Sequence, residues 1–356
     1  MERERTAADV PGSIMDGDPV LRVGIDLGTR STVLQSGRGI GGLLVPRTHR
    51  LPSIVACELD EAGAPIEVLV GEAALAHRDE LTPFNPLRCD DAAIRDGFAD
   101  HIRGILDEGR TSEVWGVVGV PPGSTPDEIE TLRLIANRIF DRTKFLDGAV
   151  LMATSYGSHD VARRSLWVDV GARAVRIAAV HGGATASEQT IVLSEGTDAV
   201  CRRLRDSLRS RFPDLPLTTI TTQRLVKTFG FVAPARPSCR LRLRLDGAEQ
   251  SIDIAPYIER ACEPLVRSVL DGLRKALREC PSDAIEEFLQ NIVLSGGGSG
   301  LQGLRERVRD HARRDFGEKA AVSVPDHSET LVANGALRWS YLLQEEDWEI
   351  PLLVGA

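Results

Sequence analysis

The sequence lacks the features that mark membrane, secreted and metal-binding proteins. No apolar run approaches the roughly 18 residues of a membrane span, and the polar N-terminus has no apolar core like that of a secretory signal. Six cysteines form no CxxC pair and seven histidines form no HxxxH or HxH pair. This favours free thiols in a reducing cytosol over disulfides or a zinc site. A net charge of −9 argues against nucleic acid as the main partner.

What the chain does have is ordinary globular composition over 356 residues, with 42% hydrophobic and 27% charged residues. At about 150 residues per domain, this length predicts two domains. Residues 1–20 are polar and rich in turn formers, and we interpret them as a flexible tail. An amphipathic membrane anchor there would have too thin an apolar face.

The first half alternates short strands with helices. Strands are expected at 21–26 and from 32, and segments 53–57 and 66–70 are expected in the same sheet. A buried strand at 114–120 stands between helices at 92–106 and 125–139. Thr125 and Glu128 form a capping box with Pro126 at the first helical position, so the second helix is the most strongly signalled.

The second half repeats this alternation. Its predicted elements are strands at 166–171, 174–180 and 190–193, helices from 198 and at 219–228, a strand pair at 240–245 and 251–254, a helical pattern at 255–279, a strand at 291–294, a helix marked by Leu301, Leu304 and Val308, and a helix at 330–343. Pro264 should kink or divide the 255–279 pattern.

Both halves open on the same short pattern. Asp26-Leu-Gly-Thr-Arg30 and Asp169-Val-Gly-Ala-Arg173 each follow a strand and precede another. Two such openings predict related domains facing each other across a cleft. Carboxylates at Asp26 and Asp169 could hold a hydrated Mg²⁺, while the N–H groups of Gly28 and Thr29 cradle phosphate. Alternatively, each aspartate caps a turn.

Three glycines follow the predicted strand at 291–294. Gly296, Gly297 and Gly298 would let a flat ligand or a phosphate lie on the backbone near the start of a helix. A flexible connection is the alternative, but it would need neither the buried strand before it nor the apolar-faced helix after it. The loop is neither a Walker A loop nor a dinucleotide-binding Gly-x-Gly-x-x-Gly motif.

Three stretches carry a family resemblance. They are Gly24-Ile-Asp-Leu-Gly-Thr29, Trp167-Val-Asp-Val-Gly171 and Asn291-Ile-Val-Leu-Ser-Gly-Gly-Gly-Ser-Gly300. They resemble the phosphate-1, phosphate-2 and adenosine motifs of the actin, sugar-kinase and DnaK-type chaperone superfamily. Within it, residues 21–345 are similar to bacterial actins of the MreB and MamK kind.

The resemblance implies an α/β actin-like fold. Two related ribonuclease-H-like lobes, each a mixed five-stranded sheet flanked by helices, carry two small subdomains and enclose a nucleotide cleft. The implied bounds are a tail at 1–20, domain I at 21–163, domain II at 164–328, a C-terminal helix at 329–345 that returns to domain I, and a tail at 346–356.

The resemblance also assigns site residues for ATP or ADP with Mg²⁺. Asp26 and Asp169 would lie beside Mg²⁺ and contact it through water. The nucleotide would be contacted by residues of both halves: Gly28, Thr29, Arg30, Gly171, Gly196, Arg224, Lys227, Gly296, Gly297 and Gly298. Arg224 stands where bacterial actins often have a glutamate, which weakens the case for a ribose contact.

Two departures concern hydrolysis. Val150 occupies the position of the family's water-orienting glutamate, and Ala174 that of a water-positioning threonine. Losing such a group typically costs about 10²–10⁴ in rate, so we expect ATP binding with slow hydrolysis. Arg173 could reach the γ-phosphate as an arginine finger does, or it could simply face solvent.

The resemblance therefore predicts a cytoplasmic filament protein whose partner is itself, assembled head-to-tail under nucleotide control. Direct membrane or nucleic-acid binding is not expected. One alternative is a non-polymerising adaptor like FtsA or PilM. A sugar or acetate kinase is another, with Asp147 or Glu195 as its base; a chaperone would need a peptide-binding domain beyond residue 345.

Overall fold

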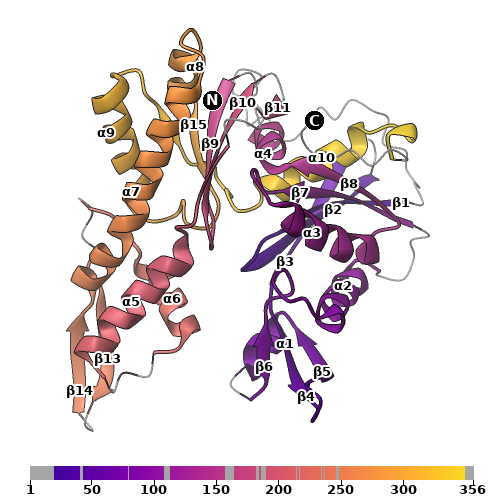
Figure 1. Cartoon of the computed structure of the whole chain (residues 1–356), viewed down its shortest axis with the longest axis horizontal. Helices are drawn as coiled ribbons and strands as arrows, with labels where there is room; N and C mark the ends of the chain where they lie inside the picture. The colour runs from indigo at the N-terminus through magenta and orange to yellow at the C-terminus, as the bar shows by residue number, and fades with distance from the viewer. Residues whose placement is uncertain are drawn as a thin grey trace. The chain divides into compact units, whose positions relative to one another are not determined.

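The computed structural model describes residues 20–40, 43–78, 80–107, 113–156, 164–181, 184–185, 190–213, 215, 217–233, 235, 237–245 and 248–348. Their contacts separate two compact units (Figure 1). Unit 1 contains the described residues up to 156 and those from Thr330 onward, and unit 2 contains those between. Most of the expected N-terminal tail, and residues 349–356, lie outside the described residues.

Unit 1 is built on a mixed sheet in the order β3-β2-β1-β7-β8. Its strands are β1 (Val20–Leu27), β2 (Ser31–Ile40), β3 (Leu43–Pro52), β7 (Glu113–Val120) and β8 (Arg142–Asp147). The strand β1 is antiparallel to β2 and parallel to β7, and β7 is parallel to β8. Val23 and Ile25 of β1 are fully buried, which places this strand in the core.

A second, small sheet in unit 1 corrects the sequence interpretation. Segments 53–57 and 66–70 do not extend the main sheet. They form β4 (Val55–Leu59) and β5 (Pro65–Val70), which pair with β6 (Thr82–Phe84) in the order β5-β4-β6. The reason is that β3 occupies the position beside β2, so the chain leaves the main sheet after Pro52.

Helices cover both faces of the unit 1 sheet (Figure 1). They are α2 (Ala92–Leu106), α3 (Pro126–Ile139), α4 (Gly148–Tyr156) and α10 (Leu331–Leu342). The short helix α1 (Glu72–His77) lies beside the small sheet, and a 3₁₀ helix, η2 (Glu346–Trp348), follows α10. The predicted capping box of α3 is confirmed, since Thr125 Oγ1 accepts from Glu128 N and the Glu128 carboxylate from Thr125 N.

The last long helix, α10, packs unusually closely in unit 1. A Cβ on Gly24 of β1 would overlap the backbone of Ala333 and Leu337. A Cβ on Gly335 of α10 would overlap the carbonyl of Leu151 in α4. Glycine at these two positions lets backbone meet backbone, so α10 is an integral layer of unit 1.

Unit 2 repeats the topology of unit 1. Its strands are β9 (Arg164–Val170), β10 (Val175–His181), β11 (Ala184–Thr185), β12 (Ile191–Leu193), β15 (Ile292–Ser295) and β16 (Val322–Ser323). The path β12-β10-β9-β15-β16 has the same strand order and directions as the unit 1 sheet. The predicted fold class and the predicted internal repeat are therefore confirmed.

The helices of unit 2 are α5 (Thr197–Arg211), α6 (Thr219–Phe229), α7 (Ala255–Glu279), α8 (Ile285–Gln290) and α9 (Leu304–Phe316), and β13 (Arg240–Leu245) pairs with β14 (Ala248–Asp253) in a hairpin. Pro264 does not divide α7, which contradicts one expected outcome. Cys262 and Leu265 are fully buried on either side of Pro264, so packing in one core holds the helix continuous.

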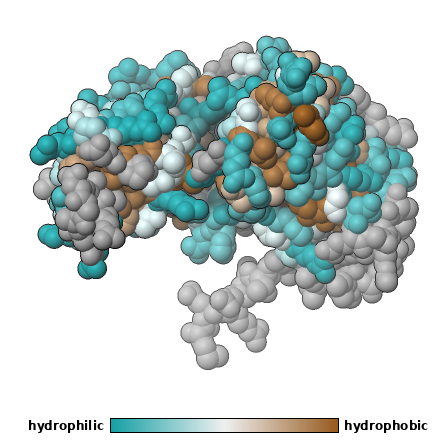
Figure 2. All heavy atoms as spheres, turned by 90° about the horizontal axis from the view of Figure 1, so that it is seen from below, coloured by the Kyte–Doolittle hydropathy of each residue, from teal (hydrophilic) through white to brown (hydrophobic). Residues whose placement is uncertain are grey.

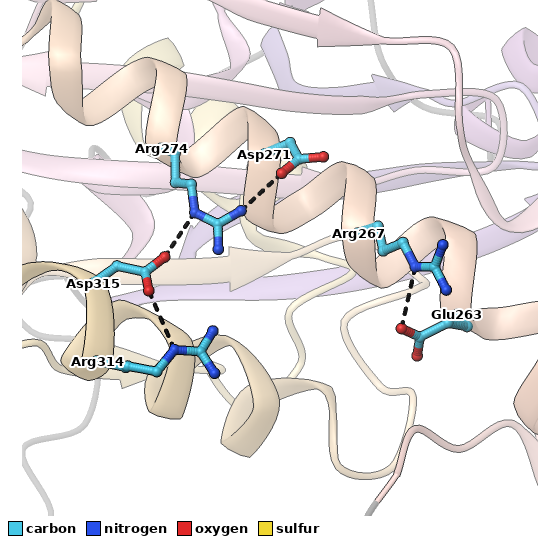
Figure 3. Close-up of polar contacts among 6 residues, drawn as sticks. All are labelled: Glu263, Arg267, Asp271, Arg274, Arg314 and Asp315. Atoms are coloured by element: carbon cyan, nitrogen blue, oxygen red, sulfur yellow. Dashed lines mark hydrogen bonds and ion pairs between the residues drawn. The ribbon is translucent and has the colours of Figure 1, made fainter.

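Ion pairs join α7 to α9 on the outside of unit 2 (Figure 3). Asp315 of α9 accepts hydrogen bonds from Arg274 of α7 at 2.7 Å and from its neighbour Arg314 at 3.3 Å. On the face drawn in Figure 2, hydrophilic residues predominate and hydrophobic ones form separate patches. This is the usual pattern of a folded protein surface.

Candidate functional site

The turn after β1 carries the first predicted group of site residues. Asp26 lies near the end of β1, and the chain reverses over Gly28–Ser31 into β2. A Cβ on Gly28 would lie 2.6 Å from the carbonyl oxygen of Ser31, which is too close for any side chain. Glycine is therefore required at this turn.

Two residues from outside the turn hold it in place. The Ser53 hydroxyl donates to the carbonyl oxygen of Gly28 at 2.6 Å, and Ser53 N donates to that of Arg30 at 3.0 Å. The Asn85 side-chain amide donates to the carbonyl of Thr29. Three successive carbonyls are thus bonded, and the turn is preorganised. Neither Ser53 nor Asn85 was predicted from the sequence to belong to the site.

The turn after β9 is its counterpart in unit 2. Asp169 lies near the end of β9, and Gly171 N donates to the carbonyl of Ala174 at 3.0 Å across the turn. Here the carbonyls of Gly171 and Ala172 accept from backbone N–H groups at the start of α5, at 3.0 and 2.8 Å. A Cβ on Gly196, the N-cap of α5, would overlap the backbone of Ala172.

The three glycines after β15 lie against the same strand end. Gly296 has a φ of 77°, and a Cβ there would overlap the Asp169 carboxylate. Gly298 N donates to the carbonyl of Val170 at 2.9 Å. Among the described residues, no atom beyond its chain neighbours lies within 4 Å of the Cβ position of Gly297, so the backbone is open there. Unit 2 therefore brings Asp169, the β9 turn, Gly196 and the glycine stretch together.

Two polar side chains beside Asp169 were not singled out from the sequence. Arg176 of β10 is its direct cross-strand neighbour. Burial raises the pKa of the Asp169 carboxyl, and the positive charge of Arg176 acts in the opposite direction. Ser295 is its neighbour in β15; this side chain is fully buried, and its hydroxyl has no hydrogen-bond partner among the described residues.

The remaining predicted nucleotide contacts are less constrained. Arg224 and Lys227 lie exposed on α6. The end of α6 is joined to the chain after the glycines, because Gln302 N donates to the carbonyl of Gly230 at 3.1 Å. Arg173 is exposed in the β9 turn, at the place that Arg30 takes in the β1 turn. The roles of these side chains stay predictions.

The positions expected to govern hydrolysis carry apolar side chains. Val150 is half-buried in the first turn of α4, and Ala174 is buried at the end of the β9 turn. The carboxylates considered for a kinase are engaged elsewhere: Asp147 Oδ1 accepts from Ala149 N at 2.7 Å, and Glu195 pairs with Arg203.

The residues present fit a nucleotide better than a protein-enclosed metal. Among the described residues, no group of three or more His, Cys, Asp or Glu could hold a metal ion. Mg²⁺ bound to a nucleotide needs only one or two carboxylates, since phosphate and water supply the other ligands. The glycine stretch leaves the backbone open at Gly297, and the Ser295 hydroxyl beside it has no hydrogen-bond partner among the described residues.

Comparison with known proteins gives one family. The family described as MreB/Mbl protein matches residues 21–346. The actin-like protein MamK of Magnetospirillum gryphiswaldense is 25% identical over 339 residues, covering 92% of this chain and 91% of MamK.

Solved structures agree on the fold. A structure titled "MamK double helical filament" has a TM-score of 0.79 at 24% identity and covers 91% of this chain and 100% of its own. A non-polymerising MamK mutant bound to AMPPNP has a TM-score of 0.66 at 24% identity, over 90% and 98% of the two chains. Across the part of the chain that the structure describes, no helix is both long and apolar enough to cross a membrane.

Proposed function

The chain belongs to the MreB/Mbl protein family of bacterial actins, and on that premise we propose that it binds ATP with Mg²⁺ and assembles head-to-tail into cytoplasmic filaments. The observation that carries the proposal is the pair of glycine-dependent turns that end β1 and β9, one in each copy of the same sheet topology. The MamK filament with the same fold supports self-assembly.

The residues of unit 2 would hold one side of the nucleotide. The glycine stretch leaves the backbone of Gly297 open for a flat or phosphate-bearing group. Asp169 is positioned against Gly296, where its carboxylate would face a hydrated Mg²⁺. The start of α5 is tied to the turn and adds the partial positive charge of a helix N-terminus.

The residues of unit 1 would hold the phosphates through the β1 turn. Ser53 and Asn85 fix its carbonyls, so Gly28 and Thr29 would present their N–H groups without reorganising when the ligand binds. Asp26 would share the Mg²⁺ site with Asp169. The Mg²⁺ ion would neutralise phosphate charge.

Hydrolysis is proposed to be slow. The Val150 side chain can neither accept a proton nor orient water, and Ala174 has no hydroxyl. Nucleotide binding depends mainly on backbone N–H groups and on charged side chains. Replacing the polar side chains at positions 150 and 174 by valine and alanine removes neither. A long-lived ATP state would favour persistent filaments, because the lobe arrangement selected by ATP would also fit the next subunit.

Sedimentation and negative-stain imaging of the full chain with ATP, ADP or no nucleotide test this proposal. We expect filaments with ATP·Mg²⁺ and single-turnover hydrolysis far slower than that of an ordinary bacterial actin. Calorimetry that detects ATP binding without sedimentation would favour the adaptor alternative, which the missing hydrolytic groups also suit. No heat with any adenine nucleotide would refute nucleotide binding.

A further inference from the structure

One end of the unit 1 sheet carries a row of cations around a tryptophan. Arg22 of β1, Trp115 of β7 and Arg142 of β8 are neighbours in the strand register. Both guanidinium groups lie over the Trp115 ring, at 5.0 and 4.3 Å from its centroid. Lys144, two residues after Arg142, shares its face of the sheet. We call these four residues the Trp115 platform.

The segment Glu345–Trp348 covers the platform, and we call it the C-terminal plug. Trp348 is only 6% exposed, and its ring lies 5.2 Å from that of Trp115 at an angle of 53°. The guanidinium of Arg22 lies 5.8 Å from the Trp348 centroid. The main anchor of the plug is therefore one aromatic side chain among cations.

The plug and the platform also carry charges of opposite sign. The plug reads Glu-Glu-Asp-Trp, and the platform contributes two arginines and a lysine. Glu345 lies 3.9 Å from Arg142. The charge of Asp347 reaches Lys144 and acts to raise the pKa of its amine. The plug thus shows which chemistry fits the platform: a tryptophan flanked by carboxylates.

Side chains, and not backbone pairing, hold the plug in place. In the described chain, the hydrogen bonds shown for Gln344–Trp348 stay within that stretch or reach Leu342. Asp347 N donates to Gln344 O at 3.1 Å, and Gln344 N donates to Asp347 Oδ2 at 2.8 Å. The plug can therefore leave as a unit without breaking a strand or α10.

Lys144 opposes closure of the plug. Its side chain is 1% exposed, and its Nζ has no hydrogen-bond partner among the described residues. Burying an amine without an acceptor is unfavourable, and burial lowers the pKa of Lys144 for the same reason. Opening would let water reach Nζ. The closed state is thus a balance between burial of Trp348 and desolvation of Lys144.

We propose that the C-terminal plug exchanges between copies of this chain, each plug docking on the Trp115 platform of a second copy. An exchanged plug makes the same contacts with the platform as a plug docked within its own copy. Exchange therefore changes the free energy of these contacts little. The five residues Gln344–Trp348 span about 17 Å when extended. A plug that docks on a second copy therefore brings the two copies into direct contact, within reach of this short segment. Exchange does not depend on nucleotide.

A capture experiment without nucleotide tests the exchange. Tagged full-length Trp348→Ala, whose platform is open, is immobilised and mixed with untagged wild type as plug donor. Untagged Trp348→Ala is the matched control, because it keeps every other contact between copies. We expect about ten-fold more capture of the wild type, as for loss of one buried aromatic anchor. Equal capture of the two donors would overturn the proposal.

A second plug-donor variant distinguishes exchange of the plug from non-specific binding through the exposed tryptophan. Lys144→Met keeps the plug sequence but removes the buried amine, so this donor should hold its own plug more tightly and be captured several-fold less than wild type. Capture equal to or above wild type contradicts the proposed balance at Lys144. Circular dichroism melts establish that each variant is folded.

A peptide assay gives the same test if Trp348→Ala does not fold. A fluorescein-labelled peptide with the sequence of Leu343–Trp348 should bind the wild-type chain saturably in anisotropy titrations. Arg142→Glu in the chain, or alanine for tryptophan in the peptide, should abolish this binding. Binding that survives both changes, or no binding to the wild type, counts against exchange.

Discussion

The β1 turn and the β9 turn have the same place in two copies of one sheet, yet they are held by different means. Side chains from elsewhere in unit 1, Ser53 and Asn85, bind the carbonyls of the β1 turn. Backbone N–H groups at the start of α5 bind those of the β9 turn, and glycines pack directly around it. The β1 turn therefore relies on two side-chain donors, whereas the carbonyls of the β9 turn accept from backbone N–H groups.

This difference bears on how each turn tolerates sequence change. The β1 turn keeps Thr29, while the β9 turn reads Gly-Ala-Arg-Ala and carries no hydroxyl. The hydrogen bonds from backbone N–H groups do not depend on side-chain identity. The β9 turn can therefore keep its shape without polar side chains. The turn expected to position the attacking water thus keeps its backbone hydrogen bonds without a hydroxyl side chain.

The largest expected loss of stability comes from a substitution that disrupts the glycine packing in unit 2. Gly296→Ala should destabilise the protein by about 3 kcal/mol, because Cβ overlaps Asp169 and alanine is strained at positive φ. Gly297→Ala, one residue along with open space around it, is the matched control. Urea unfolding measures both; similar losses for the two variants would contradict the packing argument.

Removing a hydrogen-bond donor that supports the β1 turn should destabilise the protein less than Gly296→Ala does. Ser53→Ala deletes the bond to the Gly28 carbonyl and is expected to destabilise unit 1 by about 1–2 kcal/mol. Ser340→Ala removes a buried serine-to-carbonyl bond of the same length, to Leu337 in α10, next to Arg22 at the start of β1 and away from the turn at its end. Both should lower stability, but only Ser53→Ala should also weaken ATP in calorimetry. Equal ATP affinity in the two variants would show that the turn needs no side-chain support.

The two arginines at equivalent turn positions sharpen the comparison further. If Arg173 reaches the γ-phosphate, Arg173→Ala should weaken ATP about ten-fold more than ADP, the size of one charge-assisted hydrogen bond. Arg30→Ala in the β1 turn is the matched change. Competition titrations with both nucleotides measure the ratio. Equal weakening of ATP and ADP by Arg173→Ala would exclude the γ-phosphate contact.

The smallest effect concerns the surfaces remote from the turns. Hydrogen bonding to Arg274 lowers the pKa of Asp315, so this carboxylate stabilises unit 2 above its ordinary pKa. The stabilisation is lost as pH falls through the lower pKa of the folded state. Asp315→Asn should cost less than about 1 kcal/mol near pH 7. This cost should disappear in acid unfolding experiments, and a cost independent of pH would contradict the charge argument.

Local signals in the sequence predicted much of the fold. The capping box of Thr125 and Glu128 places the start of α3, and the repeated Asp-x-Gly pattern gave the internal repeat. The strand β3 was missed because its segment, with Pro46 and charged residues, shows no clear alternation. Without it, the strands β4 and β5 were assigned to the wrong sheet.

Interactions between distant segments left no such signal. Ser53 and Asn85 act on carbonyls 25 and 56 positions away, and one serine or asparagine in a loop has many ordinary explanations. The division of α7 at Pro264, one of two expected outcomes, does not occur, because a proline's local cost is visible in the sequence whereas the buried stripe that offsets it is not. The candidate site was therefore predicted where glycines concentrate and missed where support comes from afar.

The close fit of α10 against β1 and α4 also constrains the order in which a nascent chain can fold. Unit 2 is continuous in sequence, so its whole core precedes α10 along the chain. Unit 1 is begun first but finished last, because the layer that covers β1 and β7 is translated after all of unit 2. Until α10 has been made, the backbone at Gly24 and Gly119 therefore lacks the helix that packs directly on it.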